Sequence, residues 1–219
     1  GRERLRREID AEYKRLLEFC KELSKVRREA ADIFGEKLSA ALMDLNFPQV
    51  EFESRIESGE EYVSAGGYDR LVFYISMNPG ESMRPLDQIA SGGELSRIML
   101  GMKTVFAGKD EIHTFIFDEI DTGISGKTAW KVAEKMGRLA EDHQILCITH
   151  LPQIASMQDS HYCIAKQSTD GRTMTHINRL SDEESDREIA RLLGTDHLTE
   201  AALLNAREMK KMAHGGKGK

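Results

Sequence analysis

The chain has 219 residues, enough for one large domain or two small ones with a hydrophobic core. Its 31 Lys and Arg residues and 37 Asp and Glu residues give a formal net charge of -6, which excludes nucleic-acid binding through overall basicity but allows a local basic patch. No apolar run approaches the roughly 20 residues of a membrane span and no secretory signal opens the chain, so no membrane partner is expected. The three cysteines form no C-x-x-C pair, which favours a reducing, cytoplasmic setting.

Residues 1–46 predict one long helix that belongs to a coiled coil. They contain no proline, and their apolar residues recur in steps of four and three along one narrow stripe. One helix cannot bury such a seam alone, so a partner helix is expected elsewhere. Pro48 is expected to end the helix, because it has no N–H and disfavours a helical conformation at Phe47. The stripe consists of Leu5, Ile9, Tyr13, Leu16, Cys20, Leu23 and Val26.

The hydrophobic period changes to two after residue 47, as expected for strands. Apolar and polar residues alternate in 50–56 and 71–77, and Gly66 and Gly67 between them indicate a turn, so antiparallel strands are expected. Helical and strand patterns then alternate, which indicates a parallel sheet covered on both faces. The expected elements of this part are a helix at 95–106, a strand at 112–117, a helix at 125–141 and a strand at 145–148.

After residue 150 the sequence predicts a short helix, a hairpin and two further helices. The hairpin pairs 162–166 with 173–180 around a turn at Asp170 and Gly171. The glycine-rich tail is expected to be disordered. The expected division of the chain is therefore a coiled-coil helix, a globular lobe and a tail, at 1–46, 47–213 and 214–219.

Ser91, Gly92, Gly93 and Glu94 stand at the start of the amphipathic helix 95–106. One interpretation is an N-terminal cap, because the Ser-x-x-Glu pattern satisfies two N–H groups at a helix start. The other is an anion site, because the two glycines leave backbone N–H groups uncovered at the positive end of the helix. The sequence pattern leaves both interpretations open.

Two adjacent carboxylates, Asp118 and Glu119, directly follow the first apolar strand of the expected parallel sheet. Ligands of open parallel sheets bind outside the carboxyl ends of the strands. One carboxylate can hold Mg²⁺ through water there, while its neighbour orients or deprotonates an attacking water. The other interpretation is a pair of acids at an ordinary strand-to-loop exit.

His150 follows the next strand and is expected at the same edge of the sheet. A histidine beside a carboxylate pair can contact a terminal phosphate or its attacking water, although a lone histidine at such a place can also be purely structural. No spacing of His and Cys resembles a zinc site. Residues 123–128 resemble the end of a Walker A loop, but that pattern requires a glycine where this chain has Asp121.

The order of these motifs resembles the C-terminal lobe of an ABC-type ATPase head. A Ser-Gly-Gly-Glu sequence comes first, then a strand ending in Asp-Glu, and then a strand ending in histidine. The strings 89–97, 117–126 and 147–155 resemble more narrowly the RecN family, bacterial SMC-like proteins of DNA double-strand-break repair. The resemblance extends from about residue 78 to 212, and the N-terminal helix matches it in character, as the returning arm of a coiled coil.

The resemblance implies an α/β fold, the C-terminal lobe of an ABC/SMC-type ATPase head. In that fold a mixed, largely parallel sheet is preceded by a long coiled-coil helix. It also implies a bacterial, cytoplasmic and nucleoid-associated ATPase that uses ATP and Mg²⁺ and acts in DNA repair and recombination. The signature that meets the γ-phosphate of ATP on another head would be Ser91, Gly92 and Gly93, followed by Glu94.

The same resemblance implies roles for the residues after the two strands. Asp118 would be the Walker B acid at the Mg²⁺ site, acting through water, and Glu119 the catalytic carboxylate. Asp121 would belong to the D-loop, and His150 would be the switch histidine.

The family pattern also includes an N-terminal lobe with a Walker A loop, which this sequence lacks. We therefore expect the chain to be the C-terminal part of a longer protein and to be inactive as an ATPase by itself. Its expected partners are the N-terminal lobe of the same protein, a second head in an ATP-dependent homodimer, and DNA. Two alternatives stay open: a coiled-coil interaction or scaffold module without its own catalysis, and the head of another SMC-type chromosome protein.

Overall fold

The computed structural model describes residues 1–78, 80–89, 91–106, 111–169, 172–194 and 198–215. The chain forms two compact units, one of residues 1–43 and 47–90 and the other of residues 44–46 and 91–219. The long helix thus shares a unit with the first sheet, while the division into arm, lobe and tail stays a prediction. No helix among the described residues has the length and apolar character needed to cross a bilayer.

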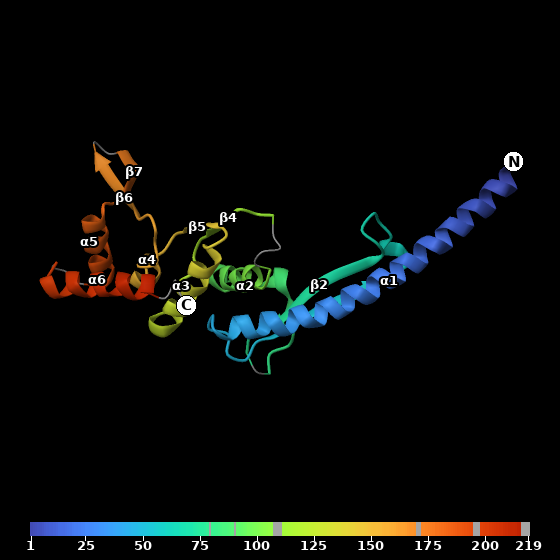
Figure 1. Ribbon diagram of the computed structural model, residues 1–219, viewed down its shortest axis with the longest axis horizontal. Coiled ribbons are helices and arrows are strands. Elements are labelled where there is room, and N and C mark those ends of the chain that lie inside the picture. Colours follow the sequence, from blue (N-terminus) through green and yellow to red (C-terminus); the bar gives the residue numbers. More distant parts are fainter. Residues whose placement is uncertain (79, 90, 107–110, 170–171, 195–197, 216–219) are drawn as a thin grey trace. The chain divides into compact units, whose positions relative to one another are not determined.

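The first unit consists of the long helix α1 (Arg2–Met43) and a three-stranded antiparallel sheet (Figure 1). Its strands are β1 (Glu51–Ser58), β2 (Asp69–Ser76) and the short β3 (Arg84–Pro85), and the predicted pairing of the first two is confirmed. Two short 3-10 helices, η1 (Glu60–Tyr62) and η2 (Leu86–Gln88), belong to the same unit.

Helix α1 is anchored on this sheet by its C-terminal half. Phe34 packs edge-on against Phe52 of β1 at 5.7 Å between ring centroids. Arg27 donates to the buried carboxylate of Asp69 at 2.9 Å. Toward the N-terminus the predicted seam is open to solvent, since Leu5 and Ile9 are each 59% exposed.

The end of α1 differs from the prediction that Pro48 stops it. The helix ends at Met43, and the N–H of Phe47 then donates to the carbonyl of Leu42 at 3.3 Å. Asn46 between them has a φ of 74°, the left-handed conformation that Asn tolerates better than most residues. A Schellman-type C-cap therefore ends the helix before the chain reaches the proline.

The second unit alternates helices and strands as predicted. Its parallel pair is β4 (Thr114–Phe117) and β5 (Gln144–Cys147), which align Phe115 with Ile145 and Phe117 with Cys147. The helices around this pair are α2 (Gly92–Val105), α3 (Gly126–Leu139) and α4 (Pro152–Ala155). Next come a hairpin of β6 (Tyr162–Thr169) and β7 (Arg172–Arg179), then α5 (Asp182–Leu192) and α6 (Glu200–Gly215).

Two predictions fall outside the described residues. They are the turn at Asp170 and Gly171, and the part of the tail at 216–219.

The predicted cover on both faces of the parallel sheet is wrong for the described residues. Phe115 and Phe117 are buried on one face, whereas Ile116 is 69% exposed and Leu146 45% exposed on the other. A two-stranded sheet with one layer of helices leaves its second face to be covered by something else.

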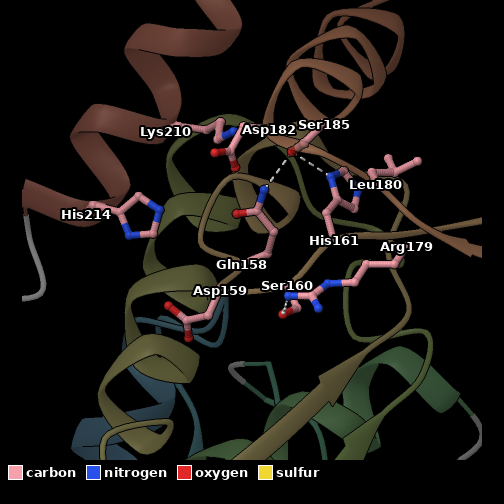
Figure 2. A pocket seen from close by; sticks show the side chains of 10 residues that line it. All are labelled: Gln158, Asp159, Ser160, His161, Arg179, Leu180, Asp182, Ser185, Lys210 and His214. Carbon is pink, nitrogen blue, oxygen red and sulfur yellow. Dashed lines mark hydrogen bonds between the residues drawn. The ribbon is translucent and has the colours of Figure 1, made fainter.

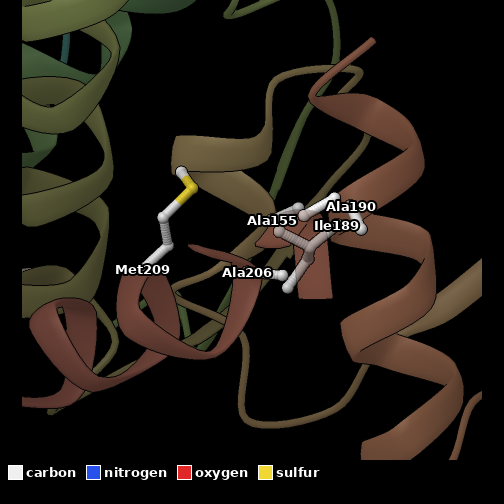
Figure 3. Close-up of a cluster of buried hydrophobic side chains, with 6 residues drawn as sticks. Ala155, Ile189, Ala190, Ala206 and Met209 are labelled. Carbon is white, nitrogen blue, oxygen red and sulfur yellow. The ribbon is translucent and has the colours of Figure 1, made fainter. Parts of the chain in front are cut away.

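A separate hydrophobic cluster joins α4, α5 and α6 (Figure 3). Ile189 of α5 and Ala206 of α6 are fully buried in it, and Met209 lies at its border at 7% exposure. The small side chains allow the helices to approach closely. The members are Ala155, Ile189, Ala190, Ala202, Ala206 and Met209.

Candidate nucleotide site

The loop after β4 carries both predicted carboxylates to solvent. Asp118 and Glu119 are exposed, and the N–H of Glu119 donates to a carboxylate oxygen of Asp118 at 2.9 Å. Glu119 has a φ of 56°, a strained conformation for a residue that is not glycine. The N–H of Thr122 donates to the carbonyl of Glu119 at 3.0 Å and closes the loop into a tight turn.

The start of α2 lies directly against this loop. A Cβ atom on Gly92 would collide with the carboxylate of Glu119. A Cβ atom on Gly93 would lie 2.9 Å from the carbonyl oxygen of Glu119 and 2.9 Å from the Cβ of Thr122. Gly93 therefore has a role within the chain, because it allows the N-terminus of α2 to approach the backbone of the loop, whereas the flexible carboxylate of Glu119 could move away from a side chain at Gly92.

Ser91 forms an N-terminal cap in the structure. Its hydroxyl accepts a hydrogen bond from the N–H of Glu94 at 3.4 Å. At α5 the reciprocal capping box is complete, since Glu184 also accepts from the backbone N–H of Ser181 at 2.8 Å. The cap interpretation of Ser91 is thus compatible with the geometry, and it leaves the hydroxyl at the same helix end that an anion would approach.

Asp121 is buried, at 3% exposure, and its carboxylate binds the segment after β5. One oxygen accepts from the hydroxyl of Thr149 at 2.6 Å and from the backbone N–H of His150 at 2.8 Å. The same oxygen lies 3.0 Å from the Nδ1 of His150, whose side chain is 72% exposed. Asp121 therefore brings the two strand ends together and orients the histidine.

Two polar side chains of α2 that hold the loop were not predicted from the sequence. Ser96 donates to the carbonyl of Asp118 at 2.8 Å. Arg97 donates to the carbonyls of Ile120 at 3.2 Å and Thr122 at 2.7 Å. In the sequence they form only a Ser-Arg pair on a predicted helix, and such a pair does not indicate whether its side chains are buried or exposed.

Arg97 and Cys147 near the site have shifted pKa values. Burial lowers the pKa of the Arg97 guanidinium, and the negative charge of Glu94 opposes that shift. Burial and the charges of Asp121 and Asp118 raise the pKa of the Cys147 thiol to about 12. The thiol is therefore protonated at neutral pH and is not a nucleophile.

The residues fit a magnesium nucleotide only in part. Two exposed carboxylates at the carboxyl end of a parallel strand suit a cation that keeps several water ligands. Among the described residues no three His, Cys, Asp or Glu side chains are arranged as a complete metal site, so Mg²⁺ would depend on water and phosphate oxygens.

The pocket in Figure 2 is lined by none of the predicted site residues. It has a volume of about 250 Å³ and is lined mainly by polar side chains from the segment 158–161 before β6, the end of β7, α5 and α6. In the figure Gln158 and His161 both point to the hydroxyl of Ser185, at 2.7 Å and 2.9 Å. Burial lowers the pKa of His161, so this side chain favours the neutral form.

No family model matches the chain. It is 38% identical to the DNA repair protein RecN of Halalkalibacterium halodurans over 96% of its own length and 37% of that protein. It is 36% identical to RecN of Bacillus subtilis and 40% identical to RecN of Deinococcus radiodurans, over 95% and 94% of its length. Over this span the chain belongs to the RecN family. It spans 37%, 39% and 36% of the lengths of these three relatives.

The fold of this RecN-family chain is that of an SMC head. It is similar to the Smc head domain with a coiled coil and joint from Pyrococcus yayanosii, with a TM-score of 0.54 and 20% identity. The match covers 86% of this chain and 35% of that one. The expected family and the α/β head fold with its long helix are confirmed, whereas the roles of the individual site residues stay predictions.

Proposed function

We propose that the chain is the C-terminal part of an SMC-like ATPase head that acts in DNA double-strand-break repair and recombination. ATP-driven dimerisation of such heads on DNA would be its mode of action. One observation carries this proposal in a RecN-family chain: the carboxylate loop after β4 is held against the glycines of α2 and, through Asp121, against His150. Membership of a bacterial repair family favours a cytoplasmic, nucleoid-associated protein.

The geometry suits the following division of roles. Asp118 would hold Mg²⁺ through water at the end of β4, because its carboxylate is exposed there. Glu119, the next residue, would orient and deprotonate the attacking water. His150 would contact the terminal phosphate, with Asp121 holding its ring. Bound ATP supplies the phosphoryl group whose hydrolysis would drive the conformational cycle.

The remaining nucleotide contacts would come from elsewhere in the complete protein. This sequence holds no Walker A loop, and it spans little more than a third of its relatives. The open apolar face of β4 and β5, with Ile116 and Leu146, has the character of a surface covered by another layer. We propose that an N-terminal lobe with the Walker A loop covers it and completes the ATPase.

A second head would complete the site from the other side. The N–H groups at the start of α2 point out of a helix N-terminus, beside the Ser91 hydroxyl. They would contact the γ-phosphate of ATP held by the opposite head, with Glu94 in the first turn of the same helix. Each nucleotide would thus lie between Glu119 of its own head and Ser91, Gly92 and Gly93 of the partner head.

Steady-state ATP hydrolysis by the complete protein tests this proposal. Glu119→Gln removes the carboxylate but keeps its size, so turnover should fall by about 10²-fold or more while ATP binding persists. Asp118→Ala should instead weaken Mg²⁺-dependent binding of ATP. Glu183→Gln, at an exposed ion pair with Arg187, is the matched control and should leave turnover unchanged.

Unchanged turnover in both loop variants would contradict the proposal. It would favour the second candidate, a scaffold module without catalysis, to which the exposed coiled-coil seam with Leu5 and Ile9 gives some support.

A further inference from the structure

Arg97 is a buried cation in the second turn of α2, with only 4% of its surface exposed. Its guanidinium donates to two carbonyls of the loop after β4, those of Ile120 and Thr122. We propose that Arg97 is a positioning residue of the ATPase reaction that fixes Glu119 through this loop, a role that rests on the proposed function. No motif of the family resemblance described above assigns it this role.

The chemistry of the contact favours a specific purpose over packing. A buried charge costs several kcal/mol of desolvation, and an apolar side chain of similar size often serves stability as well. Arg presents several N–H donors in a rigid fork, which can hold two carbonyls at fixed positions. Here one arm of the fork reaches carbonyls two residues apart, at 3.2 Å and 2.7 Å, on both sides of Asp121.

The strained backbone of Glu119 needs such support. A non-glycine residue at a φ of 56° stays there only when its surroundings over-determine it. The carbonyl of Glu119 accepts from Thr122, the residue whose own carbonyl Arg97 holds most tightly. Without the guanidinium, the turn from Glu119 to Thr122 is free to relax, and the carboxylate of Glu119 moves with the turn.

The contact also defines which nucleotide Arg97 affects. Helix α2 begins with the residues that would contact ATP on the opposite head. Arg97 itself donates hydrogen bonds to the loop of Glu119 in its own head. The effect of losing Arg97 should therefore appear at the ATP bound by the same head, and the partner's ATP should still find an intact helix N-terminus. Two variants mixed in one dimer can separate these sites.

The first measurement is steady-state hydrolysis by the complete protein with Arg97→Met. A displacement near 1 Å at a catalytic group lowers rates by about 10²-fold, so kcat should fall on that scale while the KM for ATP changes little. Arg97→Lys keeps one cationic donor and should retain an intermediate kcat. Arg207→Met, which removes a guanidinium from the ion pair with Asp186, is the matched control.

The deciding measurement mixes Arg97→Met protein with Ser91→Arg protein. A mixed dimer has one site with intact Arg97 and Glu119 from one head and intact Ser91 from the other. Its activity should exceed that of either variant alone several-fold. A mixture of Glu119→Gln with Ser91→Arg, which has the same site geometry, is the positive control.

The outcomes distinguish this proposal from the function on which it rests. If the Glu119→Gln mixture recovers activity and the Arg97→Met mixture does not, the positioning role is wrong while the dimeric ATPase stands. If neither mixture recovers, the dimer geometry of the proposed function is wrong. An Arg97→Met protein with normal kcat would also overturn the positioning role.

Amide hydrogen exchange of this chain covers the case in which Arg97→Met disturbs folding. In Arg97→Lys the amide of Thr122 should exchange several-fold faster, while the core amides of α3 keep their protection. Equal acceleration in α3 would mean that Arg97 only maintains the fold, and that result would overturn its role as a positioning residue.

Discussion

Asp121 offers a quantitative test of how the site is built, because its buried carboxylate joins the loop after β4 to the segment after β5 through two hydrogen bonds. Asp121→Ala leaves the backbone N–H of His150 and the hydroxyl of Thr149 without their acceptor. Both hydrogen bonds are only partly buried, and a hydrogen bond contributes about 0.5–1.5 kcal/mol net, so the free energy of unfolding should fall by about 1–3 kcal/mol. Asp121→Asn keeps an oxygen acceptor and should cost only about 1 kcal/mol.

The assay is urea unfolding followed by fluorescence of Trp130, the single tryptophan, which lies in α3 of the same unit. A double-mutant cycle with Thr149→Val should give a coupling energy of about 1–2 kcal/mol, because the two side chains share one hydrogen bond. A loss below about 0.5 kcal/mol for Asp121→Ala, the size of an ordinary surface substitution, would mean that these hydrogen bonds do not hold the two strand ends together.

Three further predictions concern the chain and the complete protein. Ser91→Arg in the complete protein should leave ATP binding nearly normal but prevent dimerisation and hydrolysis; normal ATP-dependent dimers with a loss of about 1 kcal/mol in stability would make Ser91 a helix cap only. Titration calorimetry of this chain with Mg-ATP should show little heat, because its sequence has no Walker A loop, and tight binding would contradict that. Burial raises the pKa of Asp186, but the hydrogen bonds from Arg207 and Lys210 lower it by more, so the pKa lies below its usual value. This carboxylate therefore stabilises the fold at pH values above the usual Asp pKa, and its contribution is lost as the pH falls through the lowered pKa of the folded state. The free energy of unfolding of Asp186→Asn, measured by urea unfolding at several acidic pH values, should fall less with decreasing pH than that of the unmodified chain.

The positions of the main site residues could be predicted because they depend on short, local patterns. Asp118 and Glu119 directly follow β4, and His150 comes three residues after the end of β5; both strands have evident apolar runs, and parallel strands bring their ends to one edge. The capped helix start at Ser91 was equally local.

The contacts between these segments could not be predicted, because they join residues far apart in the chain. The carboxylate of Asp121 is bonded to Thr149, and the need for glycine at position 93 comes from a loop more than twenty residues later. Composition also gave no sign that the second face of β4 and β5 is open, since strands buried on one or two faces have similar apolar runs.

We propose that Glu119 acts in a head whose engagement with a second head depends on ATP. Sedimentation of the complete protein with Glu119→Gln, in the presence of ATP and Mg²⁺, tests it most directly. We expect a dimer that persists because ATP is bound but not hydrolysed, and that dissociates when ATP is removed. A variant that stays monomeric in ATP, or that hydrolyses ATP as fast as the unmodified protein, would contradict it.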